Sequence, residues 1–142
     1  MKVVKIICEP RLAASMRLQG GISVRDALAR ADAVLVAQRD ACLGEIDQAL
    51  ASLGAAGLSA QAQYAAATRI LSMCVSAEEA SLERAAQSLC ELLDGADPAH
   101  PPDPRAVAVH IVAMRALHRS PASPKAKASV LAGLNQLAAT RR

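Results

Sequence analysis

The chain has 142 residues, enough for one domain with one core and too few for two comfortable ones. Apolar residues make up 53% of it, yet Phe and Trp are absent and Tyr64 is the only aromatic residue. Nearly a quarter of the residues are Ala, the strongest helix former, whereas the residues that favour strands are scarce. The composition therefore predicts an all-α fold.

The start of the chain and its cysteines predict a cytoplasmic protein without a membrane segment. Lys2 and Lys5 interrupt the short apolar start before the core of a signal peptide can form. No apolar run approaches the ~20 residues of a membrane span. The cysteines form no Cys-x-x-Cys pair and do not cluster with His or carboxylates, so we expect reduced, mostly buried thiols and neither a metal site nor a cofactor. They are Cys8, Cys42, Cys74 and Cys90.

Charge is distributed unevenly along the chain, although the net charge is only +3. Residues 1–39 hold seven Lys or Arg against three Asp or Glu, residues 40–103 hold two against ten, and residues 104–142 hold seven against none. One interpretation is complementary packing between the parts together with solvated faces. The other is that the basic end, which closes with Arg141 and Arg142, meets an acidic partner. Nucleic acid is not expected, because aromatic residues for base stacking are lacking.

The first element is an N-terminal arm over residues 1–21, in which residues 10–21 are predicted to form a short helix or arm that ends at Gly20-Gly21. Ser23 and Asp26 then have the spacing of a capping box and predict a helix to about Leu53, roughly 45 Å long. Apolar residues recur along it at spacings of three, four and seven, and we expect them to be buried. They are Val24, Leu28, Ala31, Leu35, Cys42, Ile46, Leu50 and Leu53.

Four shorter helices are predicted after it, at about 60–76, 78–94, 104–118 and 124–139. Ser59 caps the first of them, and Glu78-Glu79 are expected in the first turn of the second. The connection between these two helices is very short, so the two helices should form a tight antiparallel hairpin. Asp103-Pro104 is a strong start signal for the third. Their expected inward residues are Ala67, Ile70, Leu71 and Cys74, then Leu82, Ala86, Leu89 and Leu93, then Val107, Ile111 and Met114, and last Val130, Leu134 and Leu137.

These elements predict a domain organisation in three parts: the arm (1–21), a four-helix bundle (22–119) and a basic C-terminal helix (120–142). The helix over 60–76 has an uncommon outer face, with Tyr64 beside its inward residues. Surface helices usually display Lys and Glu, whereas a narrow stripe here carries small polar groups and almost no charge. It is either an ordinary solvated face or a docking face. Its residues are Gln61, Thr68, Arg69, Ser72 and Ser76.

No catalytic constellation can be assembled from the histidines, His100, His110 and His118. His110 lies at the edge of an apolar stripe, and a structural or half-exposed role is expected there. No Ser or Cys can be connected with a His and a carboxylate, and the glycines form no phosphate-binding loop. We therefore expect a protein that is not an enzyme.

The hairpin resembles a histidine-phosphotransfer (HPt) domain. In that family a His-x-x-Lys-Gly motif is followed by a helix with an apolar-Cys-x-x-Leu-acid pattern, and Leu89–Asp94 supplies a version of the second part. The phospho-acceptor position falls on Thr68, and the Lys and Gly positions fall on Leu71 and Ser72, so none of the three matches. The resemblance implies a four-helix bundle that docks a response regulator or a kinase. It does not extend to phosphotransfer, and His110 is followed by Ala113 and Met114 where Lys and Gly would be needed.

Most of the chain is similar to the CheE-like chemotaxis accessory proteins of alphaproteobacteria. The similarity lies in Arg11–Ala14, Gly20-Gly21, Ala85–Asp94 and Ala106–Arg115. It implies a non-catalytic modulator of a two-component chemotaxis pathway that binds a response regulator or a histidine kinase. The expected contacts are Thr68, Arg69, Ser72 and Ser76, with Arg141 and Arg142 as a second surface. The alternative is a structural helical scaffold that self-associates through its Ala-rich faces.

Overall fold

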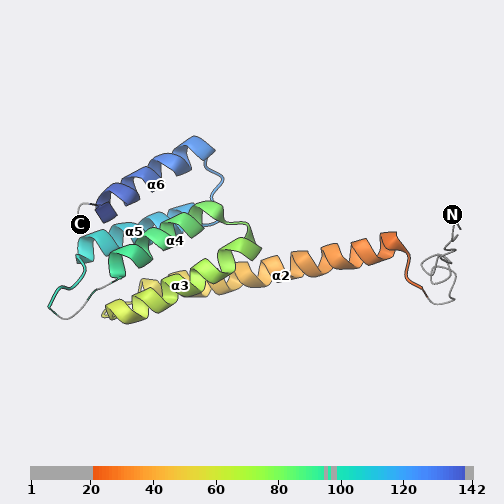
Figure 1. Ribbon diagram of the computed structural model, residues 1–142, viewed down its shortest axis with the longest axis horizontal. Helices are drawn as coiled ribbons and strands as arrows, with labels where there is room; N and C mark the ends of the chain where they lie inside the picture. Colours follow the sequence, from red (N-terminus) through yellow and green to blue (C-terminus); the bar gives the residue numbers. More distant parts are fainter. Residues whose placement is uncertain (1–20, 95, 97–98, 140–142) are drawn as a thin grey trace, which may run out of the picture. The chain divides into compact units, whose positions relative to one another are not determined.

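A computed structural model describes residues 21–94, 96 and 99–139, and in this part of the chain all regular structure is helical (Figure 1). The predicted all-α class is therefore confirmed for the described residues, and the predicted helices agree with the observed ones to within two residues at each end. The helices are α2 (Val24–Leu53), α3 (Ala60–Ala77), α4 (Ala80–Leu93), α5 (Pro104–Leu117) and α6 (Pro124–Ala139). The arm over residues 1–21 lies outside the described residues except for Gly21.

Side-chain caps begin three of the helices where the sequence predicts them. Ser23 Oγ accepts a hydrogen bond from the Asp26 amide at 3.1 Å, and Ser59 Oγ accepts one from the Ala62 amide at 3.2 Å. The Asp103 carboxylate accepts one from the amide of Arg105 at 3.0 Å, directly before Pro104. Each bond satisfies an amide that has no partner within its own helix, which is why these residues start the helices.

The turn between α3 and α4 differs from the prediction that Glu78 and Glu79 lie in the first turn of a helix. Glu78 has a φ of 59° and ends α3 in the left-handed conformation, while Glu79 is the N-cap residue of α4. The Glu79 amide donates to the Cys74 carbonyl at 3.0 Å and the Glu78 amide to the Val75 carbonyl at 3.3 Å. This pair of bonds is a Schellman motif. It ends the helix at once, and the hairpin turns on these two glutamates.

The chain divides into two compact units, residues 1–35 and 36–142. The described part of the first unit consists of residues 21–35, which include the N-terminal turns of α2, and all of these residues are exposed. The second unit contains the rest of α2 and the other four helices. The predicted boundaries at residues 21 and 119 separate an arm, a bundle and a basic helix and do not concern compact units, so they stay a prediction.

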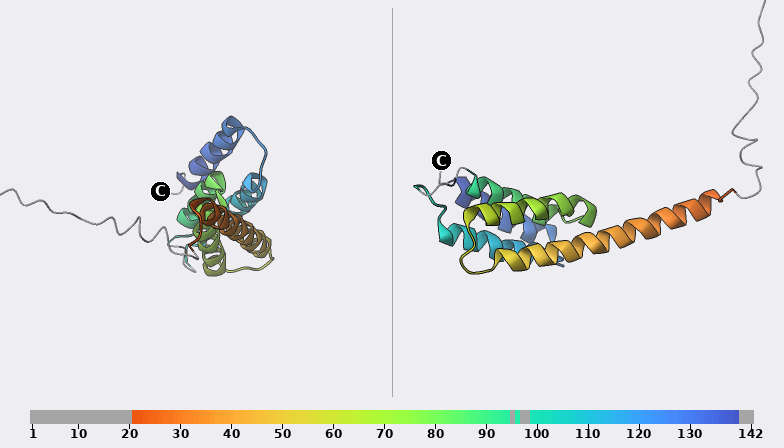
Figure 2. Two further views of the ribbon diagram at one scale, coloured as in Figure 1. Left: turned by 90° about the vertical axis from the view of Figure 1, so that its right-hand side faces the viewer. Right: turned by 90° about the horizontal axis from the view of Figure 1, so that it is seen from below.

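The core lies in the second unit, with α4 at its centre. Half of the residues of α4 are buried, and the helix packs against α3, α5 and α6 (Figure 2). From α2, the residues Cys42, Ile46, Leu50 and Leu53 join the same core, as predicted. Helix α6 contributes Leu131 and Leu134. The buried residues of α3 and α5 include Ala67, Ile70, Cys74, Val107, Ile111 and Met114, all predicted to face inward.

Two predictions of burial are wrong. Val24, Leu28, Ala31 and Leu35 in α2 are exposed, and the buried residues of this helix begin at Cys42. In α6, Val130 and Leu137 are largely exposed and Leu131 is buried in place of Val130. Leu71 of α3 is half-buried and packs against the core, as expected of an inward residue, whereas Tyr64 beside it is exposed.

Candidate functional site

The predicted contact residues of α3 form an exposed surface, here called the polar face of α3 and defined by Thr68, Arg69, Ser72 and Ser76. All four residues are exposed, and they share one side of the helix because Ser72 follows Thr68 by four residues and Arg69 by three, and Ser76 follows Ser72 by four. The exposed side chains of Tyr64 and Val75 border the face. The surface therefore combines hydroxyl groups with apolar groups and contains a single charged residue.

Two of the three hydroxyl groups of this face are already hydrogen-bonded within the helix. Thr68 Oγ1 donates to the Tyr64 carbonyl at 2.9 Å, and Ser72 Oγ donates to the Arg69 carbonyl at 2.7 Å. Such bonds use the hydroxyl proton and leave the oxygen able to accept. A partner can therefore cover these two side chains without leaving an unsatisfied donor.

The one charge of the polar face is neutralised by a neighbouring helix. The Arg69 guanidinium forms an ion pair with the Glu45 carboxylate of α2. The sequence-based expectation placed Arg69 among the contact residues without identifying this partner. The pair joins α3 to α2 and reduces the net charge of the surface.

Thr68 also lies next to α4. Its Oγ1 is 3.9 Å from Cys90 Sγ, and burial is the main cause that raises the pKa of the Cys90 thiol above its ordinary value, while the Thr68 hydroxyl acts in the opposite direction. The thiol is therefore neutral at physiological pH. Cys42, Cys74 and Cys90 are all unpaired, as expected. Cys8 lies outside the described residues.

His110 is inside the core and not at its edge, so of the two expected roles the structural one holds and the half-exposed one does not. The side chain is 0% exposed, because α4 covers α5 at this point. Its Nδ1 bonds to the Ala106 carbonyl at 2.8 Å and its Nε2 to Ser88 Oγ at 3.0 Å. A carbonyl can only accept, so Nδ1 carries the proton and Nε2 accepts from Ser88. Both nitrogens are occupied and out of reach of a phosphoryl donor.

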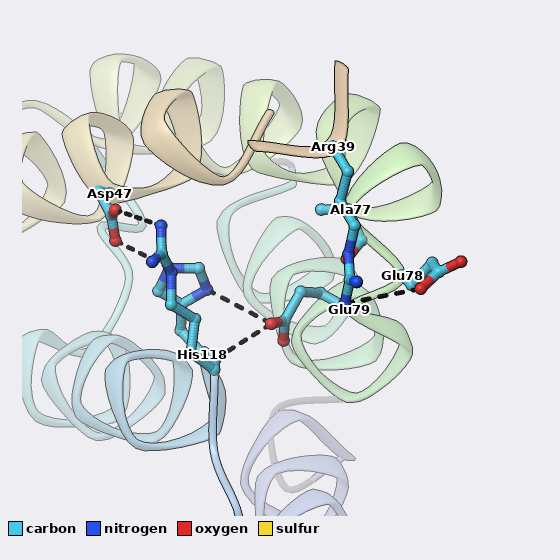
Figure 3. A network of polar contacts seen from close by, with 7 residues as sticks. Arg39, Asp47, Ala77, Glu78, Glu79 and His118 are labelled. Atoms are coloured by element: carbon cyan, nitrogen blue, oxygen red, sulfur yellow. Dashed lines mark hydrogen bonds and ion pairs between the residues drawn. The ribbon is translucent and has the colours of Figure 1, made fainter. Parts of the chain in front are cut away.

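A second polar cluster, absent from the sequence-based predictions, lies where the C-terminal end of α5 meets α2 and the α3–α4 turn (Figure 3). His118 Nε2 is 2.8 Å from an Asp47 carboxylate oxygen, and its Nδ1 is 3.9 Å from Glu79 Oε1. Arg119 binds Asp47 with its side chain at 2.9 Å and Glu79 with its amide at 3.1 Å. Glu79 is the N-cap residue of α4 and His118 the C-cap residue of α5. Because the two residues are 39 positions apart in sequence, their contact could not be predicted from local spacing.

This cluster is a network of ion pairs and hydrogen bonds between neighbouring parts of the chain. Arg39 extends it by pairing with Glu78 at 3.5 Å and donating to the Ala77 carbonyl at 3.3 Å. Asp47 pairs with the Arg119 side chain and Glu78 with Arg39, so the contacts link three parts of the second unit. Among the described residues there is no group of three or more His, Cys, Asp or Glu arranged to hold a metal ion.

A shallow groove of about 500 Å³ lies at the other end of α5. Its walls come from the α2–α3 connection, the start of α3, the Pro-rich segment before α5 and the first turns of α5. None of the described residues that line it is charged, and Gln63 carries the one polar side chain among them. The described lining therefore offers contact area and no acid–base or nucleophilic group.

The basic end of the chain is described only in part. Helix α6 carries Lys125 and Lys127 and no carboxylate, whereas Arg141 and Arg142 lie outside the described residues. No described helix is long and apolar enough to cross a membrane.

No protein-family model, curated protein or solved structure matches the chain.

Proposed function

We propose that this chain is a non-catalytic, cytoplasmic signalling protein that binds a component of a chemotaxis phosphorelay, a response regulator or a histidine kinase, and modulates signal transfer. In this proposal α2–α5 correspond to an HPt-like four-helix bundle without the phospho-acceptor histidine. The polar face of α3 is the contact surface. The basic C-terminal end, with Arg141 and Arg142, supplies a second contact.

The observation that carries the proposal is the exposed, nearly uncharged polar face of α3. Charged residues are depleted at the centres of protein interfaces, because an unpaired charge is costly to bury there. The only charge of this face is already paired with Glu45, and the Thr68 and Ser72 hydroxyl protons are already bonded. A partner that covers this face therefore leaves neither an unpaired charge nor an unsatisfied hydroxyl donor at Thr68 and Ser72.

The hairpin supports the HPt-like part of the proposal. The resemblance places the lost acceptor position at Thr68 and the Cys-containing pattern at Cys90, and these two side chains lie 3.9 Å apart across α3 and α4. A threonine cannot form the phosphoramidate that makes an imidazole a reversible phosphate carrier. The proposed effect on the pathway is therefore exerted by binding alone.

The test is a titration of the purified full chain against response regulators and histidine kinases of its host, followed by variants of the polar face. Ser72→Glu and Thr68→Arg place charge on exposed positions, so the free energy of unfolding should change by no more than about 0.5 kcal/mol. Binding should weaken more than about tenfold, because the new charge is buried unpaired at an interface. Ser129→Glu makes the same chemical change on an exposed position of α6 and is the matched control.

Unchanged binding by both polar-face variants would refute the proposed surface. Neutralising Arg141 and Arg142 should instead slow association and reduce its dependence on salt, which separates the two surfaces. Absence of binding to every component of the pathway would refute the function itself.

A further inference from the structure

The first turns of α2 carry an apolar stripe that no described residue covers. It consists of Val24, Leu28, Ala31 and Leu35, and the three larger side chains are 71%, 60% and 63% exposed. Further along the same helix the apolar residues enter the core from Cys42 onward. The sequence pattern of a buried helix face therefore begins well before the residues that the core covers.

The spacing of this stripe is that of a coiled coil. Steps of four, three and four residues place Leu28 and Leu35 at positions a of a heptad and Val24 and Ala31 at positions d. The two flanks of the stripe differ in character. Positions e hold Arg25 and Asp32, which are charged, and positions g hold Ala27 and Val34, which are apolar, all of them exposed.

The flanks decide which orientation of a pair of such helices is favourable. In a parallel pair each e position faces a g position of the other helix, so Arg25 and Asp32 would lie against apolar side chains. In an antiparallel pair e faces e and g faces g. Arg25 then meets Asp32 of the second copy, and Asp32 meets its Arg25.

The same antiparallel arrangement satisfies the stripe and the apolar flank together. When Leu28 packs against Ala31 of the second copy, Val24 packs against its Leu35, and both layers occur twice by symmetry. Ala27 then meets Val34 on the apolar flank. One alignment thus produces four apolar layers, two apolar flank contacts and two ion pairs, and opposite charges across such a seam set the orientation of the helices.

The second unit limits the pairing segment on its C-terminal side. The next e position is Arg39, which already binds Glu78 and the Ala77 carbonyl, and the next a position after Leu35 is Cys42, which is buried in the core. Arg25 and Asp32, in contrast, form no ion pair with any other described residue. The segment over 24–35 is therefore the part of the stripe that remains for a partner.

We propose that residues 24–35 of α2 pair with the same residues of a second copy of the chain in an antiparallel arrangement, which makes the protein a homodimer. The self-association that the Ala-rich helices suggest is thereby assigned to a defined surface. This inference does not depend on the polar face of α3, which lies on another helix.

The test is the mass of the full chain by sedimentation equilibrium over about a hundredfold range of concentration, since a dimer dissociates on dilution. The wild type should change from monomer to dimer within it. Arg25→Asp and Asp32→Arg each turn both ion pairs into like-charge contacts and should raise the dissociation constant at least about tenfold. The double variant Arg25→Asp/Asp32→Arg restores opposite charges and should dimerise within about threefold of the wild type.

Two further samples complete the test. A mixture of the two single variants places Asp only opposite Arg, so it should form a heterodimer although neither variant pairs with itself. Arg30→Asp makes the same charge change on the outer side of α2 and should leave the dissociation constant unchanged. Circular dichroism checks that each variant keeps its helices.

Several results would overturn the proposal. A wild type that stays monomeric throughout would show that something other than a second copy, such as another part of the chain, covers the stripe. Dimers in which the single and double charge variants bind alike would exclude the antiparallel arrangement, because in a parallel pair these positions do not face each other.

Discussion

Replacing Ser88 by Ala tests whether the buried pair of Ser88 and His110 stabilises the bundle. The substitution removes one oxygen atom from a side chain that is 3% exposed and makes no change at the surface. His110 Nε2 loses the donor that lies 3.0 Å away. Its Nδ1 keeps the bond to the Ala106 carbonyl, so the ring retains its tautomer and cannot turn to find another partner without losing that bond.

The expected cost follows from these contacts. A buried acceptor without a partner costs about 1–3 kcal/mol, and water cannot supply the missing donor because the ring is 0% exposed. Alanine is a better helix former than serine and returns about 0.5 kcal/mol in the middle of α4. The free energy of unfolding should therefore fall by about 0.5–2.5 kcal/mol.

Urea unfolding followed by circular dichroism at pH 8, where the lowered pKa keeps His110 neutral, measures this difference. The double variant Ser88→Ala/His110→Leu removes both polar groups, so it should be more stable than the sum of the single changes predicts, by about 1 kcal/mol. The dependence on urea should be equal for all variants, so that only stability has changed. A Ser88→Ala variant as stable as the wild type, or strictly additive effects, would refute the argument that the two side chains satisfy each other.

Three further predictions concern single residues. Burial, the larger cause, lowers the pKa of His110, so below the ordinary pKa of about 6.5 the unfolded chain binds a proton that the folded chain does not. The free energy of unfolding should therefore fall as the pH falls, by at most about 1.4 kcal/mol per pH unit, until the lowered pKa is reached. His110→Gln should remove this slope, and a slope that persists in the variant would contradict the prediction. Gly57 has a φ of 79°, so Gly57→Ala should destabilise the protein by about 1 kcal/mol. Gly44 lies inside α2 with open space at its Cβ, so Gly44→Ala should stabilise the protein by about 0.5–1 kcal/mol. Changes in the free energy of unfolding that have the same sign for both variants would refute this difference. Burial raises the pKa of the Cys74 thiol to about 12, so Cys74 should stay unmodified when the folded protein is treated with iodoacetamide. Peptide mass spectrometry measures the modification. Modification as fast as in urea would show that the site opens readily.

Local features of this protein could be predicted because they depend on neighbours in sequence. The caps at Ser23, Ser59 and Asp103 bind amides only two or three residues away, so their spacing was sufficient to locate the starts of three helices. The exposed position of the polar face of α3 followed from helical periodicity in the same way. Its pairing with Glu45 did not, because that carboxylate belongs to another helix.

The turn at Glu78 was mispredicted for a local reason. A glutamate strongly favours the first turn of a helix and rarely adopts a positive φ, so the residue type argued for the wrong role. The Schellman bonds to Cys74 and Val75, together with the packing of α4 along α3, outweigh the cost of this conformation.

The helical class, the positions of the helices and the polar face of α3 could be predicted from the sequence alone, because helix propensity, capping and a period of 3.6 residues act over short distances. The burial of His110 against Ser88, the position of His118 between Asp47 and Glu79, and the point along α2 at which its apolar residues become buried depend on the tertiary structure. An amphipathic pattern states which side of a helix is apolar. What covers that side depends on where the other helices of the chain end, and this the pattern does not contain.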